Sequence, residues 1–303
     1  MKIKDIGEIG LIKELAKRFR LDSSVIKGSG DDAAVVRWTK DKYLLLTCDM
    51  LIEGIHFSRP KASPFQIGWK ALGRNLSDIA AMGGSPRYAL VSLAIPESSP
   101  VSVAKGICDG IKSLADKFGV NIVGGDMARS RKIMIDISVA GEVRKKNLVL
   151  RSGAKVRDLI LVTGSLGGSK KGKHLNFMPR IKESQSIVNN FKVNSMIDIS
   201  DSLAIDLYRI IGPCNLGASI YEESIPLSRD AVKIEDALYD GEDYELLFTM
   251  GAKEAERLLK SNFARVGTRV SLIGEITDKR YGYKIIRESG HEEDLRIKGY
   301  THF

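Results

Sequence analysis

The chain has 303 residues, of which 43% are hydrophobic, and this length supports two cores of ordinary domain size. Its net charge is +9, but the lysines and arginines are dispersed or in short clusters without interleaved aromatic residues, which argues against nucleic acid and favours small anionic ligands such as phosphates. No apolar run approaches the length of a bilayer span, and three scattered cysteines form no disulfide framework, so we expect a cytoplasmic protein that binds no membrane.

The first half of the sequence alternates predicted helices and strands. Glycines or prolines mark most of the breaks between them. In chain order the pattern predicts a helix over 11–19, a glycine-rich break over 28–32, strands over 33–37 and 43–49, a helix from 64 to 82, a strand over 88–95, a helix over 100–118, and strands over 121–123 and 133–143.

A polar, basic stretch over 144–157 has no periodicity, so we place a domain boundary there and divide the chain into domains 1–148 and 149–303. The segment 176–193 is too mixed to assign. The rest of the second half predicts helices over 203–211, near 230 and over 253–259, and strands over 159–163, 196–199, 218–221, 244–249, 272–276 and 283–287. Both halves mix helices with strands, so the expected fold class is α/β (α+β).

The second predicted helix carries Asp78 among small and apolar residues. Leu72, Leu76 and Ile79 share its apolar face, whereas Asp78 lies on another face with Asn75. We expect no lysine or arginine close enough in sequence to neutralise this carboxylate. An unpaired buried carboxylate costs several kcal/mol, so Asp78 should be protonated, paired or bound to a metal. From this helix alone, pairing with a backbone donor or a distant arginine and binding to a metal are equally good interpretations.

Six predicted loops share one design, in which an apolar strand or helix delivers one or two carboxylates next to glycine or serine. They are residues 30–32, 47–49, 77–78, 124–126, 198–201 and 241–243. Small residues leave room for an ion or a phosphate beside the backbone. Oxygen ligands without a cysteine or histidine cluster favour a hard cation, Mg²⁺, over zinc.

Two phosphate-binding motifs are nearly present. Residues 28–33 have the outline of a dinucleotide loop, but a strand follows and two aspartates would repel a pyrophosphate, so we reject this interpretation. Residues 167–174 match a P-loop up to His174, which stands where a serine or threonine would bind Mg²⁺. A solvated turn is the preferred interpretation, and a P-loop-like small-molecule kinase that uses the 167–174 loop is an alternative.

Motifs along nearly the whole chain, in order, resemble those of the thiamine-monophosphate kinase family. They lie at residues 30–34, 47–57, 70–83, 124–126, 151–154, 198–201, 241–246 and 299–303. The resemblance implies the two-domain fold of aminoimidazole ribonucleotide synthetase, in which an N-terminal α/β domain dimerises through its sheet. It also implies that ATP and several Mg²⁺ ions bind between this domain and a C-terminal α/β domain.

The resemblance assigns roles to individual residues. The implied metal ligands are Asp32, Thr47, Asp49, Asp78, Asp126, Asp198 and Asp201. The implied nucleotide contacts are Gly125, Asp126, Arg151 and Ser200. His56, Glu242 and Tyr300 are implied to line the thiamine phosphate site. The chain departs from the family pattern at Cys48, Ser202 and Thr301, and its segment 165–193 matches poorly, so no role is carried over from that segment.

These observations lead to one functional expectation, the ATP-dependent phosphorylation of thiamine monophosphate to thiamine diphosphate by direct in-line, Mg-assisted transfer in a homodimer. No catalytic residue is assigned, because a phosphate monoester loses its second proton near a pKa of about 6 and needs no general base. There are three alternatives. The first is another ATP-using enzyme of the same superfamily (cyclo-ligase type), the second is the P-loop-like kinase, and the third is a non-catalytic nucleotide-binding module.

Overall fold

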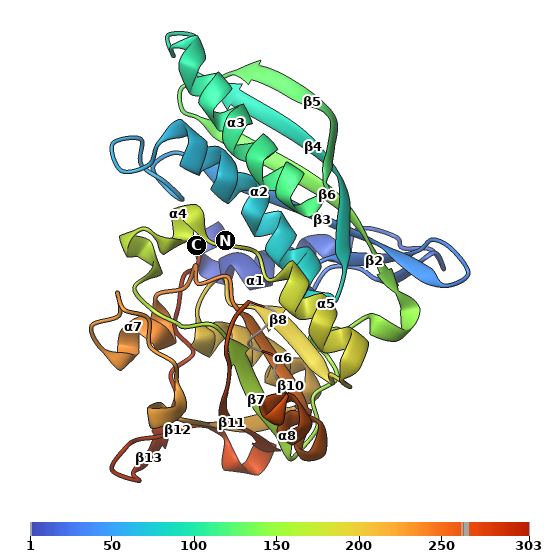
Figure 1. Cartoon of the computed structure of the whole chain (residues 1–303), viewed down its shortest axis with the longest axis vertical. Helices are drawn as coiled ribbons and strands as arrows, with labels where there is room; N and C mark the ends of the chain where they lie inside the picture. The colour runs from blue at the N-terminus through green and yellow to red at the C-terminus, as the bar shows by residue number, and fades with distance from the viewer. Residues whose placement is uncertain (1, 262, 264–266, 303) are drawn as a thin grey trace.

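The computed structural model describes residues 2–261, 263 and 267–302, and its first half is built on a six-stranded sheet of order β1-β2-β3-β6-β4-β5. These strands are β1 (Val25–Lys27), β2 (Ala34–Arg37), β3 (Lys42–Ile52), β4 (Ser85–Ile95), β5 (Asn121–Arg129) and β6 (Met134–Arg144). Neighbouring strands are antiparallel except for the parallel pair β4 and β5. The helices α2 (Pro64–Ala81) and α3 (Val101–Phe118) cover one face of this sheet (Figure 1).

The second half contains a seven-stranded sheet of order β13-β12-β9-β11-β7-β10-β8. Its strands are β7 (Asp158–Thr163), β8 (Ser195–Asp198), β9 (Leu216–Tyr221), β10 (Leu246–Gly251), β11 (Val270–Asp278), β12 (Tyr283–Ile286) and β13 (Glu292–Asp294). The helices are α4 (Lys173–Asn176), α5 (Ile181–Asn190), α6 (Leu203–Cys214), α7 (Ile234–Tyr239) and α8 (Ala252–Lys260). Both halves mix helices with strands, as the predicted class requires. The predicted boundary after residue 148 falls in the connection between the two sheets.

Glycines allow α2 and α3 to cross at very close range. A Cβ atom on Gly68 would lie 1.9 Å from the carbonyl oxygen of Ile107, and one on Gly110 would lie 2.0 Å from that of Phe65. Real Cβ atoms do not approach a carbonyl oxygen so closely, so both positions require glycine. The N-terminus of α2 is well capped, because the Ser63 side chain accepts a hydrogen bond from the backbone N–H of Gln66 and Pro64 fits the first helical position.

The helix α2 also packs against the second half. Ser77 Oγ donates to Asp198 Oδ2 at 2.6 Å, and Ser184 Oγ donates to the carbonyl of Ala80 at 2.5 Å. The hydrophobic core beneath α2 continues into the second half through Leu161, Met196 and Phe248. Asp78 therefore lies on a helix that contacts both sheets, and Figure 1 shows α2 between them.

Several elements differ from the predicted ones. The N-terminal helix α1 (Ile3–Ala16) begins earlier than predicted and is interrupted at Gly7, where φ is 65°; none of its residues is buried, so no packing fixes its pattern. β5 continues past 123 because its pairing with β4 runs through the glycines at 124 and 125. The short edge strands β1 and β13 and the helix α5 lie where no element was predicted, and α7 begins at 234 instead of near 230.

The face of the first sheet that points away from α2 and α3 carries exposed apolar side chains. Leu46, Met50, Tyr88 and Leu90 are each 42% to 53% exposed on this outer face. Every residue of the edge strand β5 is exposed as well. None of the described helices combines the length and the hydropathy that crossing a bilayer would need.

Candidate functional site

A cavity of about 1110 Å³ is lined by residues from both halves of the chain. Its walls carry four of the predicted metal ligands, together with Ser200 and all three residues predicted to line the thiamine phosphate site. In chain order these residues are Asp49, His56, Asp78, Asp198, Ser200, Asp201, Glu242 and Tyr300. The two ends of the chain lie close together beside α4 (Figure 1), and His302 N donates to Glu8 Oε2 at 3.1 Å at the edge of this cavity.

Three carboxylates from separate elements converge at this site. Asp32 precedes β2, Asp78 lies on α2 and Asp198 ends β8, and each offers an oxygen atom within 4.8 Å of the other two. Burial raises the pKa of Asp78 and of Asp198 well above the ordinary value, and neighbouring carboxylates raise it further. A divalent cation would relieve this repulsion, so the crowded, oxygen-only donor set fits Mg²⁺.

Three side chains, Thr47, Ser77 and Arg151, hold this carboxylate cluster in place. Thr47 Oγ1 donates a short hydrogen bond to Asp78 Oδ2. Arg151 contacts both oxygens of Asp32, with Nη2 at 2.7 Å from Oδ1 and Nε at 3.2 Å from Oδ2. Arg151, predicted to contact the nucleotide, thus already neutralises one carboxylate of the cluster, whereas Asp78 and Asp198 have hydroxyl partners.

Asp49 pairs with Arg74 and not with the partners of the three-carboxylate cluster. Arg74 Nη2 lies 2.9 Å from Asp49 Oδ1, and Arg74 Nη1 donates to the carbonyl of Met50 at 3.0 Å. Arg74 precedes Asp78 by one turn of α2. Burial opposes the charge of this guanidinium, but the carboxylates of Asp49, Glu242 and Asp78 raise its pKa. Arg74 lies four residues before Asp78 on the helix and its charge acts on this carboxylate, but its hydrogen bonds go to Asp49 and Met50.

The loop after β8 is organised by a carboxylate that sequence reasoning missed. The backbone N–H groups of Ser200, Asp201 and Ser202 donate to Asp206 Oδ2 at 3.1, 3.0 and 3.1 Å. Arg209 bridges the two aspartates, at 2.7 Å from Asp206 Oδ1 and 2.5 Å from Asp201 Oδ2. Burial raises the pKa of Asp206 to about 7. Asp201 is thus held by Arg209 and does not belong to the three-carboxylate cluster.

Glu242 is held by two side chains that were not predicted, Lys70 and His174. Lys70 Nζ lies 2.5 Å from Glu242 Oε1, and His174 Nδ1 lies 3.0 Å from Glu242 Oε2. The Lys70 side chain is 0% exposed and also donates to the carbonyl of His56 at 2.8 Å. Burial lowers the pKa of Lys70 to about 8; the partners of Glu242 lower the pKa of that carboxyl to about 2, although burial opposes them. Lys70 precedes Asp78 by eight residues, a helical spacing that could have revealed it.

His56 presents an unpaired nitrogen at the cavity. The backbone N–H of Ile52 donates to His56 Nδ1 at 3.0 Å, which leaves the hydrogen of the neutral ring on Nε2. This Nε2 is buried and has no hydrogen-bond partner among the described residues. Burial lowers the pKa of His56 to about 4, so the ring is neutral at pH 7. The buried donor fits a polar ligand in the cavity.

Gly125 and Asp126 lie away from the other predicted site residues. In the strand register Asp126 stands opposite Ser92, which stands opposite Asp136, so these side chains share the outer face of the sheet. Cys48 is on the same face, with its Sγ 3.1 Å from Asp136 Oδ1. A Cβ atom on Gly125 would lie 1.8 Å from a carbonyl oxygen of β4, so strand packing requires this glycine. Within one chain, Asp126 does not join the three-carboxylate cluster.

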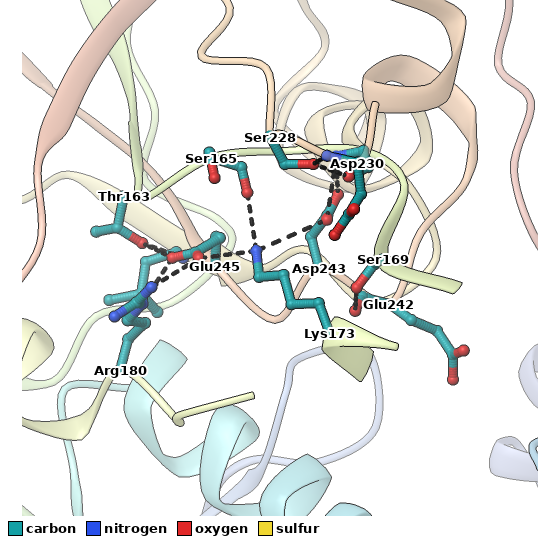
Figure 2. A network of polar contacts seen from close by, with 12 residues as sticks. Thr163, Ser165, Ser169, Lys173, Arg180, Ser228, Asp230, Glu242, Asp243 and Glu245 are labelled. Atoms are coloured by element: carbon teal, nitrogen blue, oxygen red, sulfur yellow. Dashed lines mark hydrogen bonds and ion pairs between the residues drawn. The ribbon is translucent and has the colours of Figure 1, made fainter. Parts of the chain in front are cut away.

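The 167–174 loop does not have the geometry of a P-loop. Lys173 Nζ donates to Glu245 Oε1 at 3.0 Å and to the carbonyl of Ser165 at 2.8 Å, and lies 3.9 Å from Asp243 Oδ1 (Figure 2). Arg180 holds the two oxygens of Glu245 at 2.6 and 2.7 Å. The helix that contains Lys173 has only four residues. Lys173 therefore links its loop to Glu245, the residue immediately before β10, and its charge is paired there.

Comparisons with known proteins cover nearly the whole chain. The models of the AIR synthase related protein family match residues 30–143 with the N-terminal domain and residues 140–286 with the C-terminal domain. Thiamine-monophosphate kinase of Bacillus subtilis (strain 168) is 33% identical over 326 residues, covering 98% of this chain and 100% of the relative. The Aquifex aeolicus (strain VF5) enzyme is 36% identical over 278 residues, covering 82% and 87%.

Solved structures give the same picture. The structure described as AaThiL complexed with AMPPCP and TMP has a TM-score of 0.85 and 32% identity, and the match covers 100% of this chain and 99% of that one. Thiamine-monophosphate kinase from Stenotrophomonas maltophilia K279a has a TM-score of 0.75 at 28% identity, covering 94% and 96%. The hydrogenase maturation protein HypE, bound to ATP, shares the fold at 19% identity and a TM-score of 0.71.

Proposed function

The chain belongs to the thiamine-monophosphate kinase family, and from this membership we propose that it transfers the γ-phosphoryl group of ATP to thiamine monophosphate to give thiamine diphosphate. The related structure that holds AMPPCP and TMP has the same fold over the full length of this chain. The observation that carries the proposal is the convergence of Asp32, Asp78 and Asp198 beside a cavity that also contains His56 and Glu242.

The chain's own residues bind and orient the reactants. Mg²⁺ held by Asp32, Asp78 and Asp198 would screen the repulsion between ATP and the acceptor phosphate. Thr47 keeps Asp78 aimed at the cluster, and the Nε2–H of His56 is a donor for the thiamine phosphate. The acceptor phosphate is already ionised at neutral pH, so no residue needs to remove a proton. Direct in-line transfer should invert the configuration of ATP made chiral at its γ-phosphorus, and retention would require a covalent intermediate.

The activity is tested by mixing the purified protein with ATP, MgCl₂ and thiamine monophosphate. We expect ADP and thiamine diphosphate in equal amounts, and no ADP when thiamine monophosphate is left out. Turnover of ATP that does not require thiamine monophosphate would favour a cyclo-ligase-type enzyme of the superfamily. Nucleotide binding without any turnover would favour the non-catalytic module.

We also propose a homodimer that covers the outer face of the first sheet. Exposed apolar side chains of β3 and β4 and the unpaired edge of β5 support this arrangement, because both would be costly to leave in water. Asp126 lies on the same face, so in such a dimer it would face the partner subunit. Light scattering at micromolar concentration should give the dimer mass, and Met50→Asp should give the monomer, whereas Val101→Asp at an exposed site on α3 should not.

The remaining assignments are proposals of the same kind. Thr47, Asp49, Asp126 and Asp201 are additional metal ligands, and the two domains divide after residue 148. The cysteines, all in the free thiol form, suit a reducing compartment, and we place the reaction in the cytoplasm.

A further inference from the structure

Arg74 is a charged side chain in the cavity that the proposed reaction has not used. We propose that Arg74 is the residue that binds the phosphate of the acceptor, and that Asp49 positions it; this inference rests on the proposed function. Arg74 lines the cavity from α2, and its side chain is 17% exposed. It is therefore accessible to a ligand but surrounded by protein on most sides.

Contacts on the protein side fix the orientation of the guanidinium. One terminal nitrogen lies 2.9 Å from Asp49 Oδ1 and the other lies 3.0 Å from the carbonyl oxygen of Met50. A guanidinium has five N–H donors, so these two contacts leave donor capacity for a ligand. An arginine that is held by a carboxylate on one side is pre-organised to bind an anion on the other, and its planar fork matches two oxygens of a phosphate.

The position of Arg74 selects the phosphate of the acceptor. On α2, Arg74 stands one turn after Lys70, which pairs with Glu242, and one turn before Asp78 of the carboxylate cluster. It is also the charged group that acts most strongly on His56. Arg74 thus lies between the carboxylates that would hold Mg²⁺ and the residues that would hold thiamine. The acceptor phosphate has to occupy this junction, because it must contact the transferred phosphoryl group while its thiamine part fills the other subsite.

Because the charge of Arg74 is permanent, it should attract the acceptor phosphate even when no metal ion is bound. A guanidinium stays protonated at every physiological pH, and it is present whether or not Mg²⁺ is bound. The protein should therefore prefer thiamine monophosphate to thiamine even when Mg²⁺ and ATP are absent. In a site that depended on metal ions alone, this preference would disappear with the metal.

Calorimetric binding of thiamine monophosphate and of thiamine, in EDTA and without nucleotide, tests the inference. Arg74→Met should weaken thiamine monophosphate about 10- to 100-fold, the usual effect of losing a charge-assisted contact, and leave thiamine within about twofold. Arg74→Lys should retain part of the preference. Arg209→Met is the matched control, because Arg209 also pairs with a predicted metal ligand but does not line the cavity; it should not change the preference.

The double variant Arg74→Met/Asp49→Asn covers the case in which the single variant fails to fold, because it leaves no unpaired carboxylate behind. It should lose the preference in the same way. If the wild-type protein shows no preference for thiamine monophosphate even with Mg²⁺ and ATP analogue present, the proposed function itself fails. If the wild type shows the preference in EDTA and both Arg74→Met variants keep it, only the role of Arg74 is overturned; if the preference needs Mg²⁺, the role is overturned as well.

Discussion

Asp78 is partly buried, it faces two other carboxylates, and it receives one hydroxyl hydrogen bond, so its ionised form costs the folded protein free energy. A bound ligand that stabilises the ionised carboxylate would offset this cost. A cation bound between Asp32, Asp78 and Asp198 does so, because each carboxylate then interacts favourably with its positive charge.

The first prediction separates the effect of Asp78 on stability from its effect on cation binding. Asp78→Asn should keep the fold and should not lower the melting temperature in EDTA, because it removes a repelling charge and keeps a partner for Thr47. Turnover should fall about 100-fold or more at any Mg²⁺ concentration, since the amide is a poor ligand for the cation. Thermal melting and a coupled ADP assay measure the two effects.

Asp116→Asn is the control for this experiment, because Asp116 is exposed on α3 and pairs with the equally exposed Lys112. It should change neither property. Near-normal turnover by a folded Asp78→Asn variant would contradict the assignment of Asp78 as a metal ligand.

Lys173 gives the second prediction. Lys173→Met should lower the free energy of unfolding by about 1–3 kcal/mol, because it leaves Asp243 without its nearby cation and removes one of the partners of Glu245. The affinity for ATP should stay within about twofold of the wild type. Urea denaturation and nucleotide binding provide the measurements, and Lys173→Arg should recover part of the stability. A folded variant that no longer bound ATP would revive the P-loop alternative.

Several residues that the sequence grouped also lie near one another in the structure, and the roles assigned to them stay predictions. Asp32, Asp78 and Asp198 were expected in one group and the structure brings them together, and His56 and Glu242 line the expected cavity. The side chains that hold these residues were not predicted. Lys70, Arg74 and Asp206 act through contacts that depend on the tertiary fold, and only the helical spacing of the first two from Asp78 offered a signal.

Element-level prediction depended on how strongly packing shapes the local pattern. α2 and α3 were predicted closely, because both keep apolar residues at helical spacing and have clear stop signals at the C-terminal end. α5 was not predicted, although it has buried residues, because polar Glu183 and Ser184 are among them and blur its apolar face. The edge strands β1 and β13 are three residues long, too short for any periodicity to be read.

The crossing of α2 and α3 gives the third prediction. Gly68→Ala should lower the free energy of unfolding by about 1–3 kcal/mol, because the new methyl group must push α3 away at the carbonyl of Ile107. Gly10→Ala is the matched control, since α1 is exposed there and only Ile6 lies within contact distance at 3.5 Å. Alanine is the better helix former, so this control should be neutral or stabilising. Equal effects of the two substitutions would show that the crossing is not tightly packed.

At the scale of the whole molecule, buried carboxyl groups make stability depend on pH. Burial raises the pKa of Asp31 to about 6 and that of Asp206 and Asp243 to about 7. A group whose pKa is higher in the folded than in the unfolded protein contributes stability at low pH and loses it as the pH rises through the folded value. Burial lowers the pKa of His56 to about 4, so this group makes the stability rise with pH, and the rise ends above about pH 6.5.

The fourth prediction follows from these signs. In EDTA, the free energy of unfolding should fall between pH 6 and pH 8, by on the order of 1–2 kcal/mol in total. Urea denaturation at several pH values measures it, and Asp243→Asn should make the dependence shallower, since this substitution removes one of the titrating groups. A free energy that rises over the same interval would show that these carboxyl groups are already ionised in the folded protein at pH 6.

The position of α2 between the two sheets also matters while the protein is being made. The ribosome completes residues 64–81 well before it adds residues 173–198, which supply α4, α5 and β8 on the other side of this helix. During that interval the first sheet can already form, but one flank of α2 has no covering layer and remains open to other chains or to chaperones. Although each half has its own sheet, the nascent chain has to wait for its second half before its most central helix is protected.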